Sequence, residues 1–212
     1  MKWRLAAASA LLLAACSQST VSHNTGVYLL IDTSGTYNRE VRKAEQIVLF
    51  VLGKMGPADS FAVARIDTAS FTERNIIAKA TFDDRPSTAN KQKRSFAGQL
   101  QKFADDSFAS PYTDITGGLL QAIEFLNEKQ PGRKEILIFS DMKEDLAQGY
   151  VRDLPLDLKG FDVVALNVTK LRTDNVDPRE YLTRLDQWRS RVEAGGGRWR
   201  VINDLEHLDA VL

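Results

Sequence analysis

Residues 27–36 read VYLLIDTSGT, so a run of five apolar residues is followed at once by a short polar stretch. A strand that is apolar on both faces belongs in the middle of a mostly parallel sheet with helices on either side. In open sheets of this kind, ligands bind beyond the carboxyl ends of the central strands. The stretch therefore predicts both a fold class and the place of a binding site.

The remaining chain alternates between strand and helix patterns. Residues 136–139 and 163–166 are further apolar runs, and apolar residues recur at helical spacings of three and four in other segments. These helical segments are residues 41–55, 119–126 and 181–192. Such alternation predicts an α/β fold with a doubly wound, mostly parallel sheet and helices on both faces.

Weaker patterns complete the expected domain. Residues 61–66 and 76–82 read as a hairpin, which would add one antiparallel edge strand to the sheet. We also expect a short helix around residues 96–103, a last strand at 199–202 and a last helix at 205–212. With no linker or repeat dividing the pattern, we expect one domain from residue 26 to residue 212.

The composition of the 212 residues is that of a globular protein, with 43% hydrophobic and 26% charged residues. Lysine plus arginine and aspartate plus glutamate both total 28, so there is no net field that would attract nucleic acid. We therefore expect no nucleic-acid partner.

The first residues differ in kind from the rest. Lys2 and Arg4 precede an apolar run that ends at Ala15, which is the layout of an export signal and is too short to span a bilayer as a helix. The run ends in Leu13-Ala14-Ala15-Cys16, which resembles the bacterial lipobox, and Cys16 is the one cysteine of the chain. A free thiol beside an ordinary signal cleavage site is the alternative.

The lipobox resemblance implies a signal peptide at residues 1–15, a lipidated Cys16 and a polar tether over residues 16–25. When fully extended the tether would reach about 30 Å. It implies a protein of the bacterial cell envelope that is held to the membrane by its acyl chains, since more than one chain gives stable anchoring. Ser17 after the cysteine, in place of aspartate, favours the outer membrane, facing the periplasm, in a Gram-negative cell.

Three polar clusters follow predicted strands or open a predicted helix, and together they resemble the von Willebrand factor type A family. Asp32, Ser34 and Thr36 match the Asp-x-Ser-x-Ser motif of that family, with threonine in the last place. Thr113 matches the threonine of a second motif, from which Ile115 and Gly118 depart. Asp141 matches an aspartate that follows a later strand, and Met142 stands where the family usually has glycine.

The resemblance implies a metal-ion-dependent adhesion site. Mg²⁺ or Mn²⁺ would be held by the oxygens of the five matched residues, Asp32, Ser34, Thr36, Thr113 and Asp141, either directly or through water. An Asp or Glu of a protein partner would fill the remaining coordination position. Side chains near this site would form a rim that anchors the partner, namely those of Tyr37, Phe108, Tyr112 and Met142.

Each matched residue also has a purely structural interpretation. Asp32 and Ser34 can form a turn and cap a helix, because both residue types bond to free backbone N–H groups. Thr113 and Asp141 can each cap the segment that follows them.

Two other functions stay open from the sequence. Residues 32–36 also resemble the Asp-x-Asp-x-Thr motif of haloacid dehalogenase-type, Mg²⁺-dependent phosphatases, although Ser34 replaces the aspartate that acts there as general acid and base. The second alternative is a metal-free structural component of the envelope or of a secretion apparatus. We expect a binding module that is not an enzyme, because the chain has two histidines and neither is near a candidate nucleophile in sequence.

Overall fold

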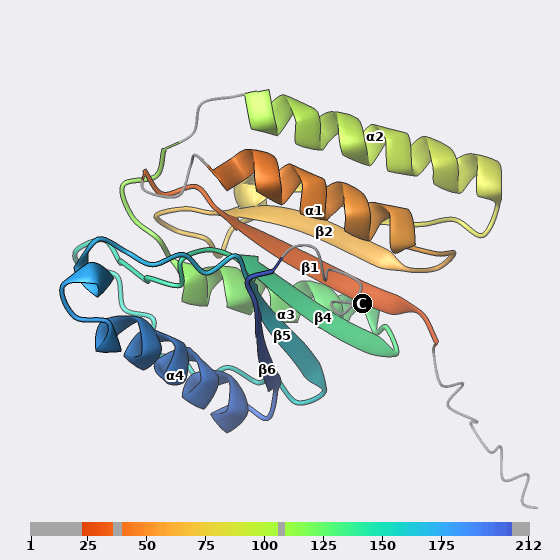
Figure 1. Ribbon diagram of the computed structural model, residues 1–212. Coiled ribbons are helices and arrows are strands. Elements are labelled where there is room, and N and C mark those ends of the chain that lie inside the picture. The colour runs from red at the N-terminus through yellow and green to blue at the C-terminus, as the bar shows by residue number, and fades with distance from the viewer. Residues whose placement is uncertain (1–22, 36–39, 106–108, 205–212) are drawn as a thin grey trace, which may run out of the picture.

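A six-stranded sheet forms the centre of the computed structural model, which describes residues 23–35, 40–105 and 109–204 (Figure 1). The strands are β1 (Thr25–Asp32), β2 (Ser60–Ile66), β3 (Ile76–Thr81), β4 (Arg133–Phe139), β5 (Phe161–Leu166) and β6 (Arg198–Ile202). Their order is β3-β2-β1-β4-β5-β6, and every pair is parallel except β2 and β3. The predicted fold class, including the antiparallel edge strand, is therefore confirmed.

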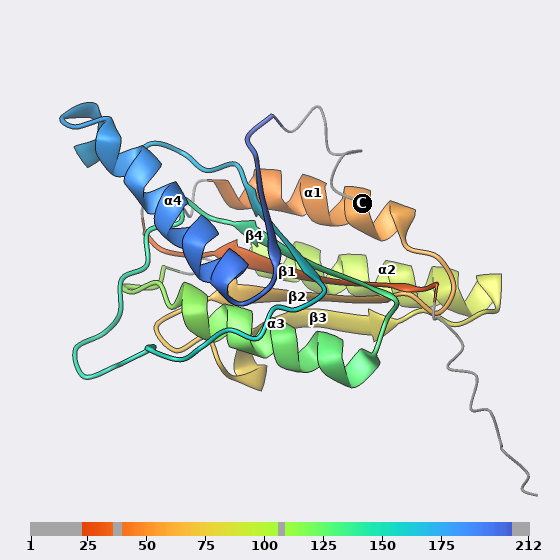
Figure 2. The same ribbon diagram turned by 90° about the horizontal axis from the view of Figure 1, so that it is seen from below.

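Four helices cover the two faces of the sheet, as Figures 1 and 2 show. One face is covered by α1 (Val41–Lys54) and α2 (Pro86–Asp105), and the other by α3 (Ile115–Lys129) and α4 (Arg179–Ala194). Two short 3₁₀ helices, η2 (Glu73–Asn75) and η3 (Thr173–Asn175), lie in loops. None of the described helices is both long and apolar enough to cross a membrane.

The central strand shows why the apolar runs are continuous. Val27, Leu29 and Ile31 of β1 pack in the core under α1 and α2. Tyr28 and Leu30 point to the opposite face and pack in the core under α3 and α4. Because successive side chains of a strand alternate between faces, a sheet covered on both sides needs apolar residues at every position of its central strands.

The helix after residue 85 differs from the prediction. A short helix was expected around residues 96–103, whereas α2 has 20 residues. Its buried side chains are only Phe96, Leu100 and Phe103, and the rest of its surface is polar. The helical period is visible only where a helix touches the core, so the polar first turns gave no signal.

Several predicted features lie outside the described residues. They are the signal segment, Cys16 and most of the tether, as well as Thr36, Tyr37, Phe108 and the last helix expected at residues 205–212.

Candidate metal centre

The carboxyl ends of β1 and β4 bring two of the predicted motifs side by side. These strands are parallel neighbours, and Ile31 is paired with Phe139. Asp32 and Ser140 therefore leave the sheet next to each other, and the Ser140 hydroxyl donates a hydrogen bond of 2.6 Å to Oδ2 of Asp32. The third motif joins them through the chain before α3.

Two bridges tie this third segment to the others. Ser110 pairs with Ser34, and its N–H donates to the carbonyl of Thr33 at 3.0 Å. Thr113 pairs with Asp145, the two residues exchanging backbone hydrogen bonds of 2.7 and 3.0 Å. Ser34, Thr113 and Asp141 consequently line one cavity of about 730 Å³.

Asp32 lies behind this cavity and is fully buried. Oδ1 accepts the backbone N–H of Ser34 at 2.8 Å, and Oδ2 accepts the hydroxyl of Ser140. Burial raises the pKa of Asp32 above its ordinary value, and these hydrogen bonds lower it in part. The turn proposed as the structural interpretation is thus present, and it holds the carboxylate in a fixed orientation.

Asp141 is also buried, with 4% of its surface exposed. Its Oδ1 accepts the backbone N–H of Lys143 at 2.8 Å, so it too caps the segment after it. Burial, with a smaller contribution from repulsion by Asp32, raises the pKa of Asp141 to about 6. No ion pair joins a lysine or arginine to either carboxylate within the described part of the chain.

These donors fit a hard divalent cation. Two carboxylates that repel each other and two hydroxyls, from Ser34 and Thr113, form an all-oxygen set of the kind that Mg²⁺ and Mn²⁺ prefer. A cation would stabilise the charged form of Asp141 and so oppose both causes of its raised pKa, burial first and repulsion by Asp32 second. Among the described residues no three His, Cys, Asp or Glu side chains gather as a metal site of their own, so hydroxyls and water would have to supply the other ligands.

Of the residues predicted for the rim, the structure describes Tyr112 and Met142. Tyr112 is half-buried beside Thr113 and is not among the residues that line the cavity. Met142, in contrast, is fully buried in the core under α3 and α4, so its assignment to the rim is wrong. Its backbone has a φ of 64°, a left-handed conformation that is unusual for methionine and that turns the side chain inward.

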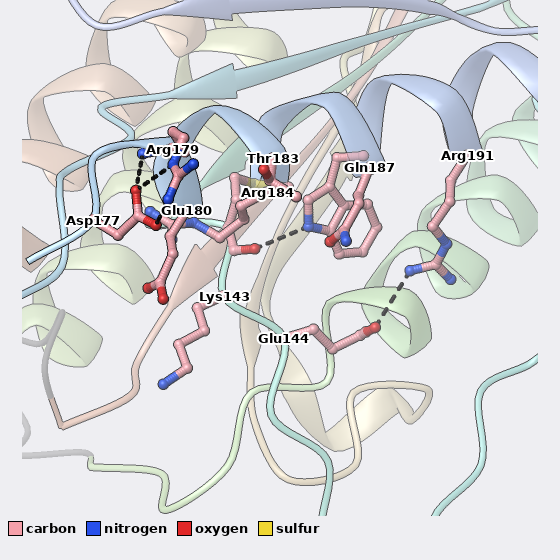
Figure 3. A pocket seen from close by; sticks show the side chains of 11 residues that line it. Lys143, Glu144, Asp177, Arg179, Glu180, Thr183, Arg184, Gln187 and Arg191 are labelled. Atoms are coloured by element: carbon pink, nitrogen blue, oxygen red, sulfur yellow. Dashed lines mark hydrogen bonds and ion pairs between the residues drawn. The ribbon is translucent and has the colours of Figure 1, made fainter. Parts of the chain in front are cut away.

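Helix α4 holds the segment that carries Asp141 (Figure 3). The indole N–H of Trp188 donates to the carbonyl of Met142 at 2.9 Å, and Arg184 donates to the carbonyl of Asp141 at 3.0 Å. Arg184 is itself fixed by two hydrogen bonds to Asp174, of 3.1 and 2.8 Å. Further along the helix, Arg191 bonds to Glu144. Trp188, which packs in the core under α3 and α4, therefore also supports the candidate site.

Asp114 is the residue that sequence reasoning missed. It is fully buried and caps α3, its Oδ1 accepting the N–H of Gly117 at 2.8 Å. It also accepts the N–H of Ser70 at 2.9 Å and a two-pronged contact from Arg152, with distances from 2.8 to 3.1 Å. The structural alternative for Thr113 was to cap this helix. Asp114 takes that role and leaves the Thr113 hydroxyl available to the cavity.

The departure of Gly118 from the family motif also has a structural cause. A Cβ at this position would lie 2.9 Å from Cδ2 of Leu30 in β1. Glycine allows α3 to approach the sheet closely just after Thr113.

Comparisons with known proteins agree with this geometry at the level of the fold. No known protein-family profile matches the chain. A stretch of 120 residues, 56% of the chain, is 28% identical to inter-alpha-trypsin inhibitor heavy chain H1 of Homo sapiens, and it covers only 12% of that protein.

Similar solved structures cover far more of the chain. A von Willebrand factor type A protein from Catenulispora acidiphila has a TM-score of 0.55 at 14% identity over 89% of this chain, which spans 41% of that protein. BatB from Bacteroides thetaiotaomicron gives 0.52 at 14% identity, with 89% of this chain and 95% of that one covered. An aerotolerance-related membrane protein from Bacteroides fragilis gives 0.55 at 14% identity, with 89% and 96% covered.

Proposed function

We propose that this chain, which has the fold of a von Willebrand factor type A domain, is an envelope lipoprotein that binds a protein partner through a divalent cation. The cation is Mg²⁺ or Mn²⁺, and the residues that hold it are Asp32, Ser34, Thr36, Thr113 and Asp141. The observation that carries the proposal is the convergence of two buried carboxylates and two hydroxyls at the carboxyl edge of the sheet, where Ser34, Thr113 and Asp141 line one cavity.

The partner's contribution follows from the ligand set. Mg²⁺ takes six oxygens and releases its waters reluctantly, so a site with few anionic ligands in direct contact keeps exchangeable water. An Asp or Glu of the partner would replace one water and form charge-assisted contacts with the site. Such a site binds rather than catalyses, since Ser34 cannot serve as the general acid and base of a phosphatase.

The place where the tether joins the domain supports a metal centre that faces away from the membrane. The proposed lipid on Cys16 lies nine residues before Thr25, the first residue of β1. β1 begins at the amino end of the parallel strands, and the metal centre lies at their carboxyl end. The eight residues of β1 span roughly 26 Å at the ordinary rise of a strand. With the acyl chains in a membrane, the metal centre would face away from that membrane, toward a partner.

Calorimetry and recovery of the partner test the two parts of the proposal. Purified protein freed of metal should release or absorb heat on addition of Mg²⁺ or Mn²⁺, and Asp32→Ala should abolish this signal. A pull-down from envelope extracts should recover an acidic partner only with wild-type protein and cation, and neither with chelator nor with Asp141→Ala. Equal recovery by wild-type and Asp141→Ala protein, each with cation and with chelator, would contradict the proposal and favour a metal-free structural role.

A further inference from the structure

Three basic side chains flank the metal centre without an ionic partner. Lys143 follows β4, and Lys170 and Arg172 follow β5. All three are exposed, and all three line the cavity that contains Ser34 and Asp141. Within the described part of the chain none of them forms an ion pair or a side-chain hydrogen bond, and Figure 3 shows Lys143 without a contact to the residues around it. We call Lys143, Lys170 and Arg172 the basic rim.

Nearby arginines behave differently. Arg184 is paired with Asp174 and Arg179 with Asp177, each through two nitrogens. These two arginines are therefore already neutralised by carboxylates of their own region. Among the described residues the basic rim has no such ion pair, and it lies beside a cavity open to solvent.

A bound cation makes the net charge of the site positive. The basic rim supplies three positive charges, and the carboxyl groups of Asp32, Asp141 and Asp145 can supply at most three negative charges. A bound divalent cation therefore leaves an excess of at least two positive charges. One carboxylate on the cation would compensate one of these charges, and a second carboxylate within reach of the basic rim would compensate another.

We infer that the partner presents two acidic side chains close together, one for the cation and one for the basic rim. This inference rests on the proposed function and adds to it the chemistry of the partner. The lysine and arginine side chains are long and lie at the mouth of the cavity, so they can reach a second carboxylate at several distances from the first. A partner segment with several possible spacings between its two acidic residues therefore fits the site. The basic rim would also speed association with such a segment, most strongly at low salt.

Two labelled peptides that differ in one residue test the inference. One is a flexible Gly-Ser peptide with a single aspartate, and the other has a second aspartate two positions further on. Their dissociation constants are measured with the full chain in a non-ionic detergent, with Mg²⁺ and with chelator. The variant K143Q/K170Q/R172Q is compared with K91Q/R94Q/K159Q, which removes as many exposed positive charges from elsewhere on the surface.

Both peptides should bind only with Mg²⁺, and the two-aspartate peptide should bind more tightly. One exposed charge contact changes affinity about 1.4- to 5-fold, so two such contacts with the second carboxylate change it about 2- to 25-fold. The basic-rim variant should weaken the two-aspartate peptide by that factor and the other peptide far less. The control variant should leave the dissociation constants of both peptides unchanged. Raising the salt concentration should narrow the difference between the peptides.

The outcomes separate the two proposals. Equal, Mg²⁺-dependent binding of both peptides would leave the metal site standing and overturn the inference about the basic rim. Equal losses in the two triple variants would do the same, because the effect would then come from total charge. An absence of Mg²⁺-dependent binding would overturn both. Tighter binding of a short oligothymidylate, independent of Mg²⁺, would assign the basic rim to phosphate and overturn the inference as well.

Discussion

Replacing Arg152 by alanine should destabilise the protein strongly, because it removes one partner of a buried ion pair. The carboxylate of Asp114 is fully buried and the Arg152 side chain is only 18% exposed. Losing one member of such a pair typically costs about 3 to 5 kcal/mol. Asp114 keeps the N–H groups of Gly117 and Ser70, so we expect the lower end, about 3 kcal/mol.

The assay is thermal unfolding followed by circular dichroism. For a domain of this size 1 kcal/mol corresponds to roughly 2 to 4 °C, so the midpoint should fall by about 6 to 12 °C. Arg179→Ala is the matched control, since Arg179 contacts Asp177 through two nitrogens but is 87% exposed. That variant should unfold at the wild-type temperature. If Arg152→Ala lowers the midpoint no more than Arg179→Ala does, the importance given to the buried pair is wrong.

Three further predictions concern separate parts of the molecule. Burial raises the pKa of Glu135 to about 7 despite the nearby Arg133 and Arg200, so its folded form holds a proton more tightly than its unfolded form. This contribution to stability is complete below about pH 4.5 and is lost as the pH rises toward 7. Glu135→Gln should therefore gain stability relative to wild type between pH 5 and pH 8 in denaturant titrations, and a pH-independent difference would refute this. Trp188→Phe removes the hydrogen bond to the Met142 carbonyl and should cost about 1 kcal/mol while weakening Mn²⁺ binding; unchanged Mn²⁺ affinity would show that α4 does not support the site. Cys16→Ser should release the protein from membranes, and mass spectrometry of the wild type should find acyl chains on Cys16; an equally membrane-bound variant would remove the lipoprotein claim.

The sequence was sufficient for the sheet, and for the expectation that the candidate residues meet at its carboxyl edge, because both depend on local patterns. Runs such as residues 27–31 and 163–166 are apolar at every position only when helices cover both faces of a sheet. The carboxyl ends of parallel strands also lie at the same edge of the sheet. The proximity of Asp32 and Asp141 can therefore be predicted without knowing the structure of the loops. The polar half of α2 left no such pattern.

Long-range contacts could not be read from the sequence. Arg152 reaches Asp114 across 38 residues, and the intervening loop shows no spacing that would select this partner. Met142 was placed on the rim because it follows a strand, yet its left-handed backbone turns it into the core. The side-chain direction after a strand depends on the turn taken there, and one sequence offers little information about that turn.

Anomalous scattering from a crystal soaked in Mn²⁺ would locate a bound cation directly. We expect one strong anomalous peak at the carboxyl edge of the sheet, within bonding or water-bridged distance of Ser34, Thr113 and Asp141, and its loss in Asp32→Ala crystals. A cavity without a peak in Mn²⁺-soaked wild-type crystals, or a peak unchanged in the variant, would contradict the proposed metal site.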